Sequence, residues 1–145
     1  LVEMQARGIA EADPALDVDG WDAAAKTAAL VNVLMGGIVT PHHVTRVGIR
    51  DLTGADVREA LGRNKRIRLV ASATRLGGKV KARVEPEVLD QQDPLAGVAD
   101  QQNALYLQTD LLGEVGIVQR TGSLTQTAYA LLTDLARISQ RLRDV

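Results

Sequence analysis

The sequence predicts an α+β fold: a mixed or antiparallel sheet of about four or more strands, with helices packed on one face. Three patterns support this. Apolar and polar residues alternate with a period of two on both sides of Gly77-Gly78, as in a β-hairpin. Two further strand-like runs follow, and helical runs lie before and after the strands. We therefore expect residues 1–145 to form a single domain.

The first half of the chain is predicted to be mainly helical. Residues 9–19, which include Pro14, are expected to form a loop, with Asp19 as the N-cap of the next helix. That helix covers GWDAAAKTAALVNVLM, ends at Gly36-Gly37 and is expected to be largely buried because Ala, Leu and Val dominate it. A turn at Thr40-Pro41, an extended segment at 44–49 and a helix over roughly 53–63 follow in order.

The second half is predicted to contain the strands and a closing helix. The hairpin consists of residues 66–76 and 79–85, and its predicted buried face carries Ile67, Leu69, Val80, Ala82 and Val84. The remaining elements are a helical turn at 94–98, strands at 104–109 and 115–119, and a helix from Leu124 onward with apolar residues along one face.

Composition indicates a globular, cytoplasmic protein and excludes several chemistries. The chain has no Cys, so disulfides, thiolate metal sites and cysteine nucleophiles are excluded. Apolar residues make up 46% of the chain, and the net charge is −1. No apolar run approaches the ~20 residues of a membrane span, so we expect no membrane contact. Because residue 1 is Leu and residues 1–8 resemble the end of a helix, we expect the chain to continue a longer polypeptide.

Charge is distributed unevenly along the sequence. Residues 1–22 contain six acids and one base, whereas residues 46–83 contain eleven bases and three acids. A basic hairpin face could bind nucleic acid, but the aromatic residues that stack on bases are missing, so we expect a solvated face and no nucleic-acid partner. The pair His42-His43 has no third ligand nearby in sequence, so we expect no metal site.

The residues with the clearest chemistry lie in EADPALDVDGWDAAAK, residues 11–26. Asp22 and Lys26 are four positions apart and therefore project from one face of the helix. Glu11 and Asp17 lie in the segment that leads into it. The carboxylates could hold a substrate ammonium, and the lysine could exchange a proton with a hydroxyl or carbonyl oxygen. An acid–lysine pair at this spacing is also common on solvated helix faces.

The spacing E-x-D-P-x-x-D-x-x-G-x-D-x-x-x-K resembles the signature of homoserine dehydrogenases. Three later segments agree with that family in order: VKARVEPEVLDQQDPLAGV, QNALYLQTDLLGEVGIV and TQTAYALLTDL. The likeness runs from about Gly8 to Ile138. It implies the substrate-binding, catalytic and dimerising part of an oxidoreductase that interconverts L-homoserine and L-aspartate 4-semialdehyde, in threonine and methionine biosynthesis.

The resemblance also implies roles for single residues. Asp22 and Lys26 match the family's acid–lysine pair for proton transfer, and Glu11 and Asp17 match its substrate-binding acids. Gly122 is the position retained from a glycine-rich loop near the cofactor. The implied cofactor is NAD or NADP, held mainly by a domain absent from this chain, so the isolated chain is expected to be inactive. The implied partners are a small amino-acid substrate and a second copy in a homodimer.

The sequence departs from the family pattern at three points. Leu16 replaces the first of two adjacent acids, and QRTGS at residues 119–123 replaces the glycine-rich segment before the last helix. No G-x-G-x-x-G fingerprint for a dinucleotide occurs between a strand and a helix. The altered loop favours an alternative function: a non-catalytic module for oligomerisation or amino-acid sensing.

Overall fold

The computed structural model describes residues 15–99 and 102–143. It contains two compact units, Leu1–Ala96 and Gly97–Val145, and each is described here by itself. The helix end expected at residues 1–8 lies outside the described residues, and the single domain expected over residues 1–145 stays a prediction.

The first unit is a mixed sheet with helices, as the sequence predicts. Its three strands are hydrogen-bonded in the order β1-β3-β2, with β1 parallel and β2 antiparallel to β3. The elements are α2 (Ala15–Val18), α3 (Trp21–Met35), the 3₁₀ turn η1 (Pro41–His43), β1 (Thr45–Arg46), α4 (Gly54–Gly62), β2 (Lys65–Leu76) and β3 (Lys79–Asp90). The α+β class is therefore confirmed, and α2 corrects the expectation that 9–19 is loop throughout.

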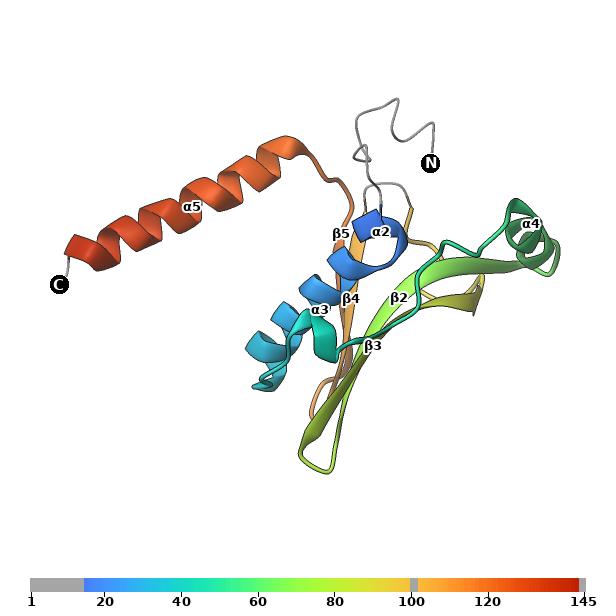
Figure 1. Ribbon diagram of the computed structural model, residues 1–145, viewed down its shortest axis with the longest axis horizontal. Helices are drawn as coiled ribbons and strands as arrows, with labels where there is room; N and C mark the ends of the chain where they lie inside the picture. Colours follow the sequence, from blue (N-terminus) through green and yellow to red (C-terminus); the bar gives the residue numbers. More distant parts are fainter. Residues whose placement is uncertain (1–14, 100–101, 144–145) are drawn as a thin grey trace. The chain divides into compact units, whose positions relative to one another are not determined.

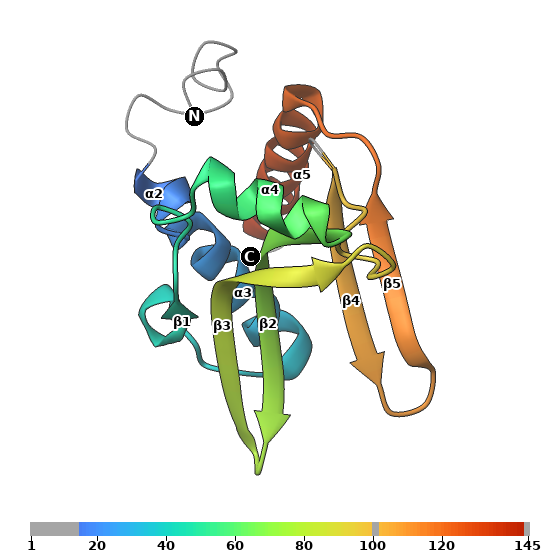
Figure 2. The ribbon, with the colours of Figure 1, turned by 90° about the vertical axis from the view of Figure 1, so that its right-hand side faces the viewer.

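The hairpin predicted at Gly77-Gly78 is present (Figures 1 and 2). Both glycines have positive φ, 56° and 79°, a conformation that glycine adopts without a steric cost. Ala82 and Val84 are buried as predicted, whereas Ile67, Leu69 and Val80 are half-buried. β3 extends to Asp90, beyond the predicted end at Glu85, because its pairing with β2 continues to Lys65.

The larger of two buried clusters in the first unit lies between α3 and the hairpin. The buried residues that form it are Ala24, Ala28, Val31, Val44, Ala82 and Val84. Ala24 and Val84 have no exposed surface, and the small alanines allow the helix to lie close to the strands. The prediction that this helix is largely buried is wrong: Leu30, Val33 and Leu34 are 43%, 80% and 51% exposed. Only one face of α3 meets the hairpin.

The start of α3 also differs from the prediction. The N-cap is Gly20, in the left-handed region at φ 76°, and no side chain caps the helix. Asp19, the predicted cap, instead forms an ion pair with Arg50. A capping preference is local, so a distant cation that binds the carboxylate can override it.

α4 begins with a capping box. The Thr53 hydroxyl accepts a hydrogen bond from the Asp56 amide, and the Asp56 carboxylate accepts one from the Thr53 amide at 2.8 Å and one from its hydroxyl at 2.6 Å. The hydroxyl hydrogen bond, followed by the backbone one, holds the pKa of Asp56 below its usual value. The N-terminus of α4 is thus fixed by two neighbouring side chains.

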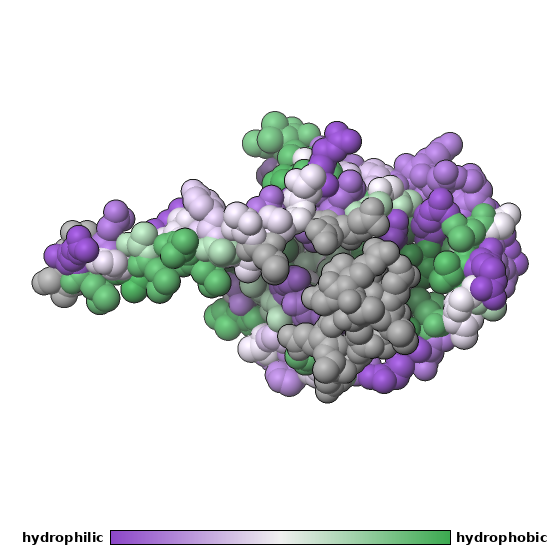
Figure 3. Space-filling model, turned by 90° about the horizontal axis from the view of Figure 1, so that it is seen from above, coloured by the Kyte–Doolittle hydropathy of each residue, from purple (hydrophilic) through white to green (hydrophobic). Residues whose placement is uncertain are grey.

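The second unit contains the strands β4 (Asn103–Thr109) and β5 (Gly113–Gln119), paired antiparallel, and the helix α5 (Leu124–Arg143). Tyr106 is paired with Gly116, and a Cβ at Gly116 would lie 2.7 Å from the tyrosine ring. α5 is amphipathic, and Figure 3 shows apolar residues along it. Its exposed large apolar residues are Tyr129, Leu131, Leu132, Leu135, Ile138 and Leu142. None of the described helices is long and apolar enough to cross a membrane.

Candidate functional site

Asp22 and Lys26 lie in contact at the start of α3. Lys26 Nζ is 2.6 Å from Asp22 Oδ2, and the two residues are one helical turn apart. The lysine side chain is 71% exposed and the aspartate side chain 48% exposed. An ammonium and a carboxylate that solvent reaches are accessible to a polar substrate, and the pair can exchange or hold a proton at a substrate oxygen.

The structure describes only one of the two residues predicted to bind the substrate, Asp17 and Glu11. Asp17 is exposed on α2, and its carbonyl accepts a hydrogen bond of 3.0 Å from the Gly20 amide, which brings the end of α2 next to the start of α3. No ion pair joins Asp17 to Lys26 in the described part of the chain. Glu11 lies outside the described residues. A shared pocket for all four residues therefore stays a prediction.

A segment that the sequence predicts as extended holds the junction of α2 and α3 in place, through contacts that the sequence did not indicate. Residues 46–50, called the strap here, begin with the last residue of β1 and contact residues 18–21. The Ile49 amide donates to the Val18 carbonyl at 2.8 Å, and Arg50 binds Asp19. These contacts join residues about thirty positions apart in sequence, so no local pattern could have predicted them.

Aromatic contacts hold the first residue of α3. The Arg46 guanidinium carbon lies 3.6 Å from the centroid of the Trp21 ring, a cation–π contact. His42 meets the same ring edge-on at 5.1 Å. His43 Nδ1 accepts a hydrogen bond from the Thr40 amide at 3.1 Å. The two histidines therefore have structural contacts, and no three metal-ligating side chains cluster among the described residues.

Gly122, the predicted cofactor-binding residue, lies between β5 and α5 and is half-buried. A dinucleotide is usually bound by a glycine-rich turn that connects a parallel strand to a helix N-terminus. β5 is instead antiparallel to β4, and the connection to α5 has one glycine. These residues do not fit a dinucleotide site by themselves.

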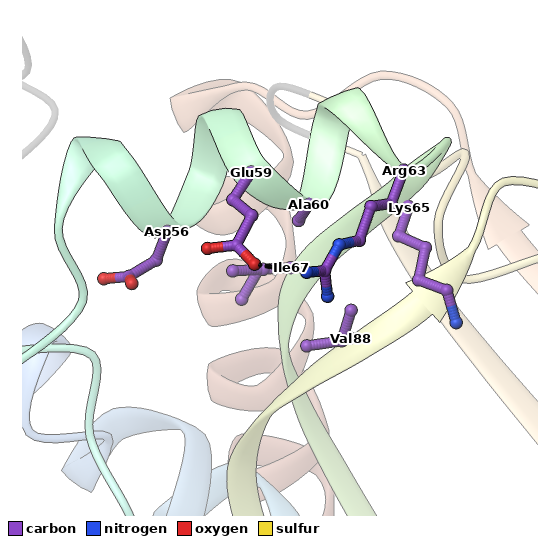
Figure 4. Close-up of a pocket in the computed structure, with 7 residues that line it drawn as sticks. All are labelled: Asp56, Glu59, Ala60, Arg63, Lys65, Ile67 and Val88. Atoms are coloured by element: carbon purple, nitrogen blue, oxygen red, sulfur yellow. Dashed lines mark ion pairs between the residues drawn. The ribbon is translucent and has the colours of Figure 1, made fainter.

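One open pocket, with a volume of about 310 Å³, lies between α4 and the hairpin (Figure 4). Its floor is formed by Ala60, Ile67 and Val88, and its rim is charged. The rim charges already have partners: Glu59 binds Arg63 at 2.7 Å, Lys65 binds Asp90 at 3.3 Å and Asp56 binds Thr53. We take the Asp22–Lys26 pair as the candidate site because these two residues, unlike those of the pocket, match the acid–lysine pair of the family that the sequence resembles.

Comparison with known proteins decides the family. The family model described as homoserine dehydrogenase matches residues 1–136. The chain belongs to the homoserine dehydrogenase family. The NAD(+)-dependent homoserine dehydrogenase of Pseudomonas canavaninivorans is 38% identical over 139 residues, which are 95% of this chain and 40% of that protein. The homoserine dehydrogenase of Bacillus subtilis is 32% identical over 143 residues, which are 99% of this chain and 33% of that protein.

Solved homoserine dehydrogenase structures have the same fold. The Staphylococcus aureus enzyme at pH 6.0 superposes with a TM-score of 0.85 and 31% identity, over 99% of this chain and 36% of that one. The Thiobacillus denitrificans enzyme has a TM-score of 0.83 and 34% identity, over 93% and 31% of the two chains. The resemblance based on the EADPALDVDGWDAAAK motif is thus confirmed, and this chain spans about 31 to 40% of the length of these homoserine dehydrogenases.

Proposed function

We propose that this chain is the substrate-binding and catalytic part of an NAD- or NADP-dependent homoserine dehydrogenase. The observation that carries the proposal is the Asp22–Lys26 ion pair, exposed at the start of α3 in a chain of this family. The reaction interconverts L-homoserine and L-aspartate 4-semialdehyde, in the cytoplasm, as a step toward threonine and methionine. A homodimer, the assembly that the family resemblance implies, is part of the same proposal.

The residues of this chain serve substrate binding and proton transfer. Lys26 donates a hydrogen bond to the reacting oxygen of the substrate and exchanges a proton with it, while Asp22 holds the ammonium in place. Asp17, together with Glu11, accepts hydrogen bonds from the substrate ammonium. Three carboxylates and one ammonium favour a ligand that carries a positive charge over a simple carboxylic acid.

The cofactor is assigned mainly to polypeptide outside this chain. The antiparallel β5 and the single Gly122 in the following loop do not fit a dinucleotide site. We therefore expect neither dinucleotide binding nor homoserine oxidation from the 145 residues alone. Calorimetry with NAD and NADP tests this, and tight binding of either would contradict the assignment.

The decisive experiment restores the missing length. This chain replaces the equivalent residues of the Pseudomonas canavaninivorans enzyme, which is 38% identical to it. Homoserine oxidation is then followed by the absorbance of the reduced nicotinamide. We expect activity in the chimera that is lost with Lys26→Ala. A folded chimera that is inactive, but binds homoserine in calorimetry, would favour the non-catalytic amino-acid-sensing alternative that the QRTGS loop suggests.

A further inference from the structure

We propose that Arg50 is a positioning residue for the Asp22–Lys26 site, acting through its two-point ion pair with Asp19; this inference rests on the proposed function. Arg50 Nε lies 2.9 Å from Asp19 Oδ1, and Nη2 lies 3.0 Å from Oδ2. Asp19 stands between the two parts of the site, two residues after Asp17 and three before Asp22. Fixing Asp19 therefore fixes both parts.

The strap connects this junction to β3, the central strand of the sheet. The Val47 amide donates to the Val84 carbonyl at 2.8 Å, and Val84 has no exposed surface. Two residues later, the Ile49 amide donates to the Val18 carbonyl. The strap thus links β3 to the C-terminal end of α2 through two backbone hydrogen bonds. Arg50 is its last contact with the junction.

The strap and the junction are in close backbone contact. A Cβ at Gly48 would lie 2.5 Å from the Val18 carbonyl oxygen and 2.7 Å from the Asp19 Cα, so only glycine fits there. The junction residue Gly20 is close to the strap as well, because a Cβ there would lie 3.2 Å from the Arg46 side chain. At this close contact, the planar two-point ion pair with Arg50 fixes the orientation of the Asp19 carboxylate.

Because the Arg50–Asp19 ion pair is partly exposed to solvent, its effect on the site can be distinguished from an effect on folding stability. The Arg50 side chain is 62% exposed and the Asp19 side chain 35% exposed. Ion pairs that water reaches contribute little to folding stability. The geometry of a substrate site is far more sensitive, because a small displacement of the residues that bind and orient the substrate weakens its binding as well as lowering the rate. Breaking the pair should therefore change substrate kinetics and leave stability nearly unchanged.

The main test uses the complete dehydrogenase polypeptide. Arg50→Gln and Asp19→Asn are each expected to raise the KM for homoserine about tenfold, with the KM for the nicotinamide cofactor and Tm unchanged. Because both act through one contact, the double variant should be no worse than either single variant. A homoserine KM near that of the unchanged enzyme in both variants, or effects that add in the double variant, would overturn the proposal.

A control is available at the C-terminal end of α4. Arg63 and Glu59 form an exposed ion pair there, with side chains 72% and 62% exposed, away from the site. Arg63→Gln removes a comparable surface pair and should leave the homoserine KM unchanged. An equal rise in KM for this variant would overturn the positioning role, because the effect would then be general.

A second readout does not depend on dehydrogenase activity. Trp21 is the single tryptophan of the 145 residues, and the strap residue Arg46 covers its ring. In this chain, Arg50→Gln should make Trp21 fluorescence easier to quench with acrylamide, and Arg63→Gln should not. Unchanged quenching in Arg50→Gln overturns the proposal. If Arg50→Gln increases quenching but the unsubstituted complete polypeptide has no dehydrogenase activity, the role of the strap is supported. Only the proposed dehydrogenase function is then contradicted.

Discussion

Lys26 Nζ and Asp22 Oδ2 are 2.6 Å apart, yet both side chains are open to solvent. An exposed pair at this helical spacing contributes about 0.3 to 0.5 kcal/mol to stability. Lys26→Ala and Asp22→Asn should therefore change the free energy of unfolding by no more than about 0.5 kcal/mol in urea titrations. In the complete dehydrogenase, each should lower kcat about a hundredfold.

The control for this prediction is Lys65→Ala, which removes the ion pair with Asp90 at the far end of the hairpin. That variant should keep normal turnover. Near-normal turnover in both Lys26→Ala and Asp22→Asn would exclude the proton-transfer role.

Gly20→Ala should destabilise the first unit more than Gly36→Ala. Both glycines have positive φ, 76° and 57°, and alanine in that region costs about 1 kcal/mol. At Gly20 the new methyl group would also press on Arg46 and Val84, whereas at Gly36 nothing lies within 4 Å. We expect losses of about 2 to 3 kcal/mol and about 1 kcal/mol respectively, from urea unfolding followed by Trp21 fluorescence. Equal losses would show that the crowding at Gly20 relaxes freely.

Val84→Ala tests the core between α3 and the hairpin. Val84 has no exposed surface, so removing two methyl groups leaves a cavity and should cost about 2 kcal/mol. Val33→Ala, on the open face of α3 where Val33 is 80% exposed, should change stability by less than about 0.5 kcal/mol. The comparison is made by urea unfolding, and a large loss in Val33→Ala would mean that this open face is covered in solution.

The capping box of α4 predicts a dependence on pH. The pKa of Asp56 is lower in the folded chain, so its contribution to stability is present above the unfolded pKa and is lost as pH falls through the folded pKa. Thr53→Ala removes the hydroxyl hydrogen bond and should raise the Asp56 pKa toward its usual value, as measured by NMR titration of the carboxyl carbon. The same variant should cost about 1 kcal/mol at neutral pH. An unchanged pKa of Asp56 in this variant would mean that the Thr53 hydroxyl does not lower it.

Local sequence patterns predicted the parts of the fold that have local causes. The hairpin follows from the conformational freedom of Gly77-Gly78 and from alternation on both sides. The contact between Asp22 and Lys26 follows from helical spacing alone. The helix starting near Thr53 agrees with its capping box.

Features with distant causes were missed. The Asp19 carboxylate was expected to cap α3, but Arg50, 31 positions away, binds it instead. The strap depends on the absence of a side chain at Gly48, and that requirement arises only once the backbone of Val18 lies against it. The exposed face of α3 was predicted as buried because its composition does not reveal how many neighbours the helix has.

The contact between Tyr106 and Gly116 constrains how the second unit can evolve. The two residues face each other across β4 and β5, and the tyrosine ring occupies the space that any side chain at Gly116 would need. A side chain at Gly116 therefore requires the Tyr106 ring to move away or to be replaced by a smaller residue. Among related sequences the two positions should covary, with glycine retained opposite an aromatic residue and larger residues opposite small ones.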